Sequence, residues 1–249
     1  MKTIYIEDIK NINKRRVMKI AKKLSNMNTK EEIVVALSQN LKRHKELNEA
    51  IENYGIKILD GRWIFKFLLI DILEYISKNE ERTLETQNIA ILIHNGDEIL
   101  TDQIENIAKR VKILKLITSK KNIYSYIEKK LYDQYGIAIQ ITNNKSKSLL
   151  DADIIINFDL SEERINEYNI NNKAIIVNIQ NQIKLNKNEF HGKNINNFKI
   201  QYTNDFIGNS KKELFDENIL YESYIYRKDT FENIKKQLKK DNVTLIRLV

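Results

Sequence analysis

Apolar residues in the first part of the chain recur with the spacing of helices. One helical face is formed by four residues at positions i, i+3, i+4 and i+7: Val17, Ile20, Ala21 and Leu24. A second helix is predicted to begin at Thr29, because Glu32 completes a capping box. Residues 62–78 are apolar nearly all round, which is typical of a buried helix. Residues 1–86 are therefore predicted to form a mainly helical domain that ends in the polar stretch 77–87.

From about residue 87 the pattern changes to short apolar runs separated by helical segments. Five runs have the length of strands: 89–93, 113–117, 137–141, 153–158 and 174–179. Such an alternation favours βαβ units and a parallel sheet with helices on both faces. The predicted fold class is α/β, with a Rossmann-like domain over 87–249. This domain is expected to end in a helix at 229–240 and a strand at 243–249.

Composition narrows the chemistry. The chain of 249 residues is long enough for two domains. It has no cysteine, and its three histidines lack the spacing of metal ligands, so we expect no metal site. The start of the chain lacks a signal-peptide core, and charges interrupt the most apolar stretch, 63–76. We therefore expect a cytoplasmic protein with no membrane contact.

The positive charge is concentrated near the start of the chain. The formal net charge is +8, and the first 50 residues include Lys14, Arg15, Lys19, Lys22 and Lys23 on one predicted helix. A basic excess attracts polyanions, so basic N-terminal helices could bind nucleic acid or an acidic protein partner. The same excess is also typical of a solvated, lysine-rich surface.

Polar residues follow the predicted strands of the second domain, at the edge where open α/β sheets bind ligands. We predict a nucleotide or small-molecule site formed by these residues: Asn95, Gly96, Thr118, Ser119, Lys120, Asn143, Asn157 and Asp159. His94 and Asp159 also sit at strand ends, and an acid–base pair between them is a hypothesis for catalysis.

The segment 87–183 resembles the NAD(P)-binding half of shikimate dehydrogenase-like Rossmann domains. The resemblance rests on a strand, a glycine turn at Gly96, a helix, a second strand, the polar turn 118–121 and the run Asp153 to Asn157. In that family the turn after the second strand reads the adenosine ribose or its 2′-phosphate. The turn 118–121 is basic and has no acidic residue, so the resemblance implies an NADP-like dinucleotide.

The first turn departs from that family. A dinucleotide site needs several glycines so that backbone amides can approach the pyrophosphate. Here Gly96 is the only glycine of the turn, and acidic side chains at Asp97, Glu98 and Asp102 would repel a phosphate. A working dehydrogenase of that type is not expected, and whether the chain is an enzyme stays open. Two functions remain: binding of a nucleotide or small ligand at the strand ends, and non-enzymatic interaction through the basic N-terminal helices.

Overall fold

The computed structural model describes the chain except for residues 1, 145–146, 148, 187–188, 204–212 and 227–229. The chain forms two compact units, each built around its own sheet. Unit 1 comprises Met1–Ile64 and Ile200–Val243, and unit 2 comprises Phe65–Lys199 and Thr244–Val249. The boundary predicted between residues 86 and 87 lies inside unit 2, and unit 1 is made of two separate stretches of sequence.

Unit 1 contains a three-stranded parallel sheet in the order β1-β2-β3. Its elements are β1 (Lys2–Ile6), α1 (Lys14–Asn28), β2 (Ile33–Leu37), α2 (Gln39–Lys42), α3 (Lys45–Glu52) and β3 (Lys57–Ile58). The helix predicted to begin at Thr29 is wrong, because the chain forms β2 there instead. All five residues of β2 are buried, and three of them are β-branched, which suits a central strand covered on both faces.

Helices cover both faces of this sheet. The side chains of a strand alternate between faces, so Val35 and Leu37 pack with α1 and α3 through Leu24 and Leu47. The opposite face carries Val34 and Ala36, which join α10 (Glu217–Ile225) through Ile219 and Leu220. The second stretch of unit 1 thus supplies the helix that covers one face of a sheet built by the first stretch.

Unit 2 contains six parallel strands in the order β6-β5-β4-β7-β8-β9. The strands are β4 (Asn88–Leu92), β5 (Ile113–Ile117), β6 (Gln140–Thr142), β7 (Ile154–Asn157), β8 (Ile175–Asn178) and β9 (Lys193–Ile195). Numbered along the sequence, this is the order 3-2-1-4-5-6 of doubly wound Rossmann sheets. The strand order reverses between β4 and β7.

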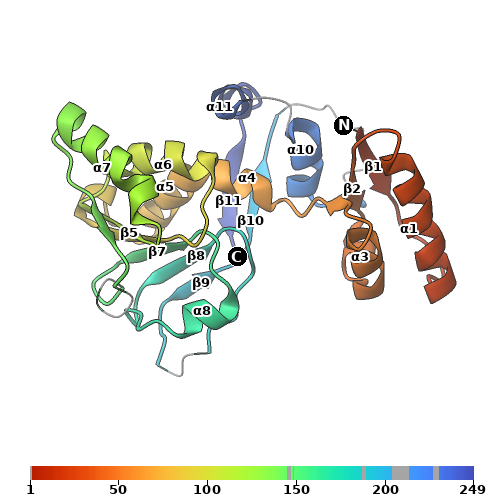
Figure 1. Ribbon diagram of the computed structural model, residues 1–249, viewed down its shortest axis with the longest axis horizontal. Coiled ribbons are helices and arrows are strands. Elements are labelled where there is room, and N and C mark those ends of the chain that lie inside the picture. Colours follow the sequence, from red (N-terminus) through yellow and green to blue (C-terminus); the bar gives the residue numbers. More distant parts are fainter. Residues whose placement is uncertain (1, 145–146, 148, 187–188, 204–212, 227–229) are drawn as a thin grey trace. The chain divides into compact units, whose positions relative to one another are not determined.

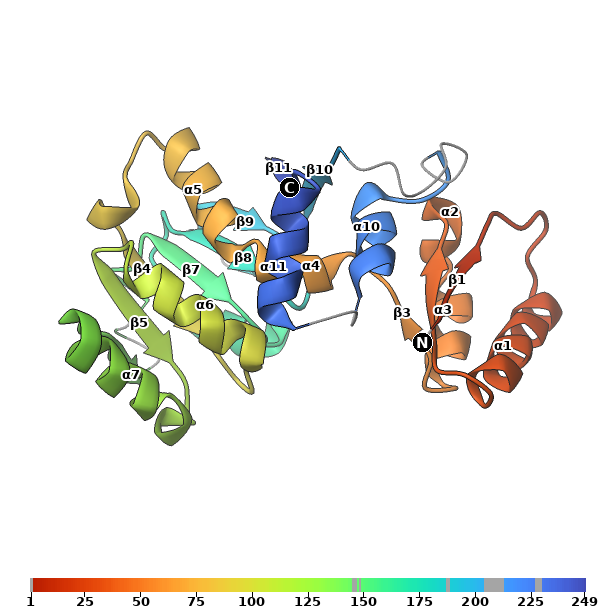
Figure 2. The ribbon, with the colours of Figure 1, turned by 90° about the horizontal axis from the view of Figure 1, so that it is seen from above.

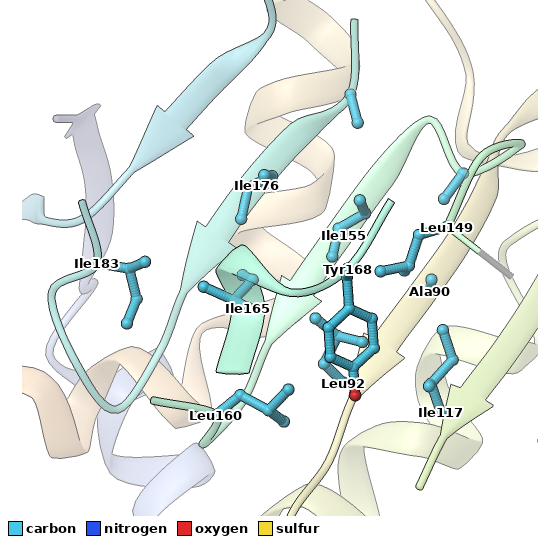
Figure 3. Close-up of a cluster of buried hydrophobic side chains, with 12 residues drawn as sticks. Ala90, Leu92, Ile117, Leu149, Ile155, Leu160, Ile165, Tyr168, Ile176 and Ile183 are labelled. Atoms are coloured by element: carbon cyan, nitrogen blue, oxygen red, sulfur yellow. The ribbon is translucent and has the colours of Figure 1, made fainter. Parts of the chain in front are cut away.

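Both faces of the sheet of unit 2 are covered by helices (Figure 1). The helices are α5 (Leu69–Asn79), α6 (Glu98–Ala108) and α7 (Lys121–Tyr135) on one face, and α8 (Glu162–Asn166) on the other. Viewed from above, α6 lies between α5 and α7 (Figure 2). On the α8 face, Ala90, Leu92, Ile155 and Ile176 from the strands form one core with Ile165 of α8 (Figure 3). The predicted α/β fold class is confirmed.

The remaining elements, apart from a 3₁₀ helix inside unit 2, lie close in sequence to the points where the chain passes between units. They are α4 (Arg62–Phe67), the 3₁₀ helix η1 (Leu84–Thr86), β10 (Phe198–Gln201), α11 (Phe231–Lys240) and β11 (Thr244–Leu248). The predicted C-terminal helix and strand correspond to α11 and β11. Thr230 caps α11, and Asp229, where that helix was expected to begin, lies outside the described residues. Within the part of the chain that the structure describes, no helix has the length and apolar character needed to cross a membrane.

Candidate functional site

A small pocket of ≈ 80 Å³ lies at the carboxyl ends of β4, β5 and β6 in unit 2. It is next to the reversal of strand order, which is where doubly wound sheets bind their ligands. Its lining consists of Ile93, His94, Ile117, Thr118, Ser119, Asn143, Leu160, Arg164 and Tyr168. Three of the predicted site residues, Thr118, Ser119 and Asn143, are thereby brought together in one place.

The described lining of the pocket has basic and neutral polar groups but no acidic side chain. Nη1 of Arg164 lies 2.8 Å from Nδ1 of His94. Arginine can only donate, so Nδ1 of His94 is the acceptor in this contact. Tyr168 is buried, and burial raises the pKa of its hydroxyl, an effect that Arg164 opposes. The pocket therefore combines an apolar floor with groups suited to a ligand that carries acceptors or negative charge.

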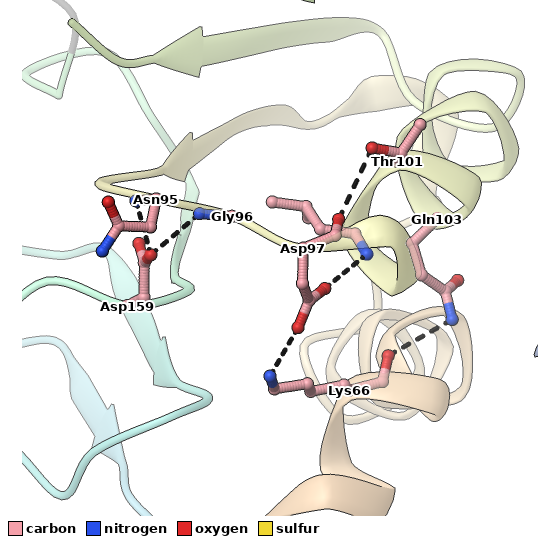
Figure 4. Close-up of polar contacts among 8 residues, drawn as sticks. Lys66, Asn95, Gly96, Asp97, Thr101, Gln103 and Asp159 are labelled. Atoms are coloured by element: carbon pink, nitrogen blue, oxygen red, sulfur yellow. Dashed lines mark hydrogen bonds and ion pairs between the residues drawn. The ribbon is translucent and has the colours of Figure 1, made fainter. Parts of the chain in front are cut away.

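Three consecutive amides of the turn after β4 are directed at one carboxylate, that of Asp159. Figure 4 shows two of them, the amides of Asn95 and Gly96. The N–H groups of His94, Asn95 and Gly96 donate to its two oxygens over 2.6, 2.7 and 2.9 Å. In a dinucleotide-binding domain, amides at this place face the pyrophosphate. Asn95, Gly96 and Asp159 were predicted to contact a ligand. In the structure, the amides of Asn95 and Gly96 donate hydrogen bonds to the carboxylate of Asp159.

The contacts of Asp159 also bear on the hypothesis that His94 and Asp159 form a catalytic acid–base pair. Its carboxylate bonds the main chain of His94, whereas the imidazole of His94 lies against Arg164. The two side chains therefore do not form the acid–base pair that their positions at strand ends had suggested.

Neighbouring groups fix this turn in place. Asp97 accepts the N–H of Leu100 at 3.0 Å as the cap of α6, and its other oxygen lies 2.5 Å from Nζ of Lys66. Asp97 thus caps α6 and neutralises a lysine. The hydroxyl of Tyr124 lies beneath the turn, and burial, with the charges of Asp159 and Asp97, raises its pKa to about 12.

The polar turn after β5, residues 118–121, contacts the turn after β4 through a side-chain hydrogen bond. Nζ of Lys120 donates to Oδ1 of Asn95 over 2.8 Å. The hydroxyl of Thr118, which is 2% exposed as a residue, accepts the N–H of Lys120 at 3.1 Å. Lys120 therefore has a neutral partner on the first turn, and it is not among the residues that line the pocket.

Asn157 has a different surrounding from the other predicted site residues. It is buried, and its Nδ2 donates to Oδ1 of Asn178 over 3.0 Å. Nδ2 of Asn178 in turn donates to Asn194 and Asn196 at 2.7 and 3.1 Å. This asparagine ladder ties the carboxyl ends of β7 and β8 to the segment at β9. Asn157 does not line the pocket, but it hydrogen-bonds to the backbone of the lining residue Leu160.

The sequence analysis did not include Arg164 and Tyr168. Arg164 lies in α8 and Tyr168 follows that helix by two residues, so neither stands at a strand end. The only signal in the sequence was a short helix directly after the strand 153–158.

No protein-family model matches the chain, and no curated protein sequence matches it. Among solved structures, it is similar to ornithine carbamoyltransferase from Pyrococcus furiosus, with 11% identity over 73% of this chain and 62% of that chain, and a TM-score of 0.33. A putative aspartate carbamoyltransferase from Trypanosoma cruzi has 11% identity over 71% and 68%, and a TM-score of 0.29. L-tryptophan dehydrogenase from Nostoc punctiforme has 13% identity over 72% and 51%, and a TM-score of 0.34. Similarities of this size say nothing about what the chain binds.

Proposed function

We propose that unit 2 binds a small ligand of nucleoside or mononucleotide size, one group of which enters the ≈ 80 Å³ pocket at the ends of β4, β5 and β6. The observation that supports this is the joint position of Thr118, Ser119 and Asn143 beside the reversal of strand order. In doubly wound domains the end of the second strand meets the ribose of the adenosine half of a dinucleotide. The corresponding strand here is β5, and it ends directly before Thr118.

The ligand that fits this arrangement is smaller than a dinucleotide. The turn that would receive a diphosphate already holds the carboxylate of Asp159. On the far side of the switch point, the ends of β7 and β8 are joined by the Asn157–Asn178 contact. An NADP-like cofactor would have to displace the carboxylate of Asp159 and lie across the Asn157–Asn178 contact. The proposed ligand therefore occupies only the half of the crevice at the ends of β4, β5 and β6.

The lining indicates the chemistry of the ligand. Arg164 and the hydroxyls of Thr118 and Ser119 can meet acceptor atoms, and Asn143 can both donate and accept. The described lining contains no acidic side chain. A ribose hydroxyl, a nucleobase edge or one phosphate group can be held by such a set.

The test is a titration of the full chain with adenosine, AMP, ADP-ribose and NADP, followed by thermal shift and calorimetry. We expect adenosine or AMP to stabilise the protein, by about 2.7 kcal/mol at one hundred times the dissociation constant. Arg164→Met and Thr118→Val should each weaken binding at least tenfold, whereas Arg247→Met, at an exposed arginine of β11, should not. If none of the four compounds stabilises or binds the protein, the proposal is wrong. Tighter binding of NADP than of AMP would contradict the claim that the ligand is smaller than a dinucleotide.

A second candidate function rests on α1 in unit 1. Its exposed face carries Lys14, Arg15, Arg16, Lys19, Lys22 and Lys23, and the helix contains no acidic residue. Lys14, Arg15 and Arg16 lie in the first turn of α1, where cations oppose the helix dipole, so these three residues cost stability where they stand. A polyanion bound along α1, either nucleic acid or an acidic protein, would offset that cost.

This candidate is tested by salt-dependent binding of duplex DNA, single-stranded RNA and poly-glutamate. Binding should weaken with salt, and joint replacement of Lys19, Lys22 and Lys23 by Gln should reduce the slope of log K against log salt by up to about 3. The matched control replaces the exposed Lys236, Lys239 and Lys240 of α11. No binding to any of the three probes at low salt removes this candidate.

A further inference from the structure

The turn after β4 forms an anion-binding site, and the anion bound there is a side chain of the same protein, the carboxylate of Asp159. Three consecutive N–H groups, from His94, Asn95 and Gly96, lie within 2.6–2.9 Å of the two oxygens of Asp159. Convergent backbone amides of this kind bind phosphates and carboxylates, and hydrogen bonds to an ionised acceptor are among the stronger ones in proteins. The bound carboxylate shows that the three amides are arranged to hold an anion.

Asp159 is held in position from both sides along the chain. Before it, the N–H of Phe158 donates to Leu92 at 3.0 Å, and the ring of Phe158 is buried. After it, the N–H of Leu160 donates to Oδ1 of Asn157 at 2.9 Å. The backbone on either side of Asp159 is therefore fixed at the end of β7. As a result, its carboxylate has little freedom to move away from the turn 94–96.

The anion-binding turn is fixed as well. The N–H of Ile93 donates to Ile117 at 3.0 Å, so the turn starts from a strand that is anchored in the sheet. Gly96 has φ +69°, and the hydroxyl of Tyr124 fills the space beneath it. A tethered anion facing a rigid receptor acts at a high effective concentration, so an anion from solution competes at a disadvantage.

We infer that Asp159 is the specificity-determining residue of unit 2. Its carboxylate takes the place of a ligand phosphate at the turn 94–96 and excludes ligands that would put a diphosphate there. Removal of the carboxylate makes the same three amides available to a phosphate group. This inference builds on the ligand pocket proposed above, yet it concerns the turn beside the pocket and has a readout of its own.

The test compares the full-length wild type with Asp159→Ala and Asp159→Asn, using inorganic pyrophosphate and ADP-ribose as probes at constant ionic strength. Calorimetry should show pyrophosphate binding to Asp159→Ala at least tenfold more tightly than to wild type. Asp159→Asn should lie between them, because the amide oxygen still accepts while the NH₂ group meets a donor. Asp133→Ala is the matched control, since it removes an exposed carboxylate of α7 far from the turn in sequence.

Thermal shift in phosphate against chloride buffer provides the second readout, which serves even where Asp159→Ala is less stable. Phosphate should raise the midpoint of both Asp159 variants by more than it raises the midpoints of wild type and Asp133→Ala, which share the unchanged pocket. The same response in all four proteins, or none in either Asp159 variant, overturns the inference. Adenosine and AMP are titrated into the wild type separately: their failure to bind counts against the pocket proposal alone, and failure of pyrophosphate to bind the variants counts against Asp159 alone.

Discussion

The hydroxyl of Tyr124 lies against Gly96, in the space that a Cβ at position 96 would fill. Tyr124 is a buried residue of α7, and Gly96 has φ +69° in the turn after β4. The helix after β5 and the turn after β4 are thus fitted to each other through a side chain that glycine does not have. This fit holds the three amides of the turn in their common direction.

Gly96→Ala should therefore destabilise the chain by on the order of 3 kcal/mol in urea unfolding, since it adds a steric overlap to the cost of a left-handed backbone. Gly136→Ala is the matched control: its φ is +66°, but nothing lies within 4 Å of the added Cβ. It should cost only about 1–2 kcal/mol. Tyr124→Phe should recover part of the loss in the Gly96→Ala background. Equal losses at positions 96 and 136 would show that the overlap is unimportant.

Glu222 of α10 should make unit 1 less stable as the pH rises. The residue is fully buried, and among the described residues neither carboxyl oxygen has a hydrogen-bond partner. Burial and then the charge of Asp60 raise its pKa to about 8, against smaller opposing effects from Lys57 and nearby amides. The folded chain therefore binds a proton that the unfolded chain releases near pH 4.5, and stability falls between about pH 4.5 and 8.

Glu222→Gln should remove that fall. Relative to the variant, wild type should lose on the order of 4 kcal/mol of unfolding free energy between pH 4.5 and 9. Urea denaturation across this range measures the difference. Glu217→Gln, at an exposed position of the same helix, should keep the pH dependence of wild type. Parallel curves for wild type and Glu222→Gln would mean that this carboxyl group is ionised in the folded chain.

Glu105 of α6 should have the opposite pH dependence. Hydrogen bonds from Lys109 and Lys130, each 2.7 Å long, lower its pKa to about 2. A lowered pKa stabilises the fold above pH 4.5, and this contribution is lost as the pH falls toward 2. Glu105→Gln should cost about 1 kcal/mol at pH 7, because the group is partly exposed to solvent, and nothing near pH 2. Glu128→Gln, on the exposed face of α7, is the comparison, and a loss that persists at pH 2 would exclude the ionic explanation.

Asn178→Ala should destabilise unit 2 by about 2–4 kcal/mol. The change removes one of the two acceptors of the Nδ2 group of Asn157, which keeps the carbonyl of Leu160 at 3.3 Å, and it removes the donor to Asn194 and Asn196. Asn157 and Asn178 are both buried at the ends of neighbouring strands. Asn143→Ala, at an exposed position after β6, should stay within about 0.5 kcal/mol of wild type. Chemical denaturation monitors both variants. A small loss at Asn178 would indicate that water replaces the ladder.

Four strands of unit 2, β4, β5, β7 and β8, could be predicted because each is a short, mostly apolar and buried run between polar turns. The strand expected at 137–141 forms at 140–142 as β6, and β9, a mainly polar run of three residues, was not predicted. Residues 113–117 were predicted as a strand and form β5, and the run 89–93 is β4 shifted by one residue. The strand β2 was missed because a capping pattern at Thr29 and Glu32 stands directly before an equally apolar run. An apolar run of five residues has no period of its own, and only the sheet around it makes it a strand.

In the candidate site, too, some features could be predicted from the sequence and others could not. Thr118, Ser119 and Asn143 could be grouped because parallel strands bring their carboxyl ends to one edge. The bonds of Asp159 to the turn 94–96 join residues more than 60 positions apart, and no local pattern in the sequence reports such a contact. The acidic residues after Gly96 were expected to repel a phosphate, but the carboxylate that stands in its place comes from the fourth strand of the sheet.

The division of unit 1 into two stretches has a consequence for synthesis. Val34 and Ala36 of β2 are covered by Ile219 and Leu220 of α10, which are made only after all of Phe65–Lys199. At 5–20 residues per second, the ribosome takes roughly 10–40 s to reach α10 after completing β2. Throughout that time one face of the β1–β2–β3 sheet lacks its helix, while the residues of unit 2 between them can already fold. The nascent chain thus exposes an apolar sheet face to chaperones until its second stretch emerges.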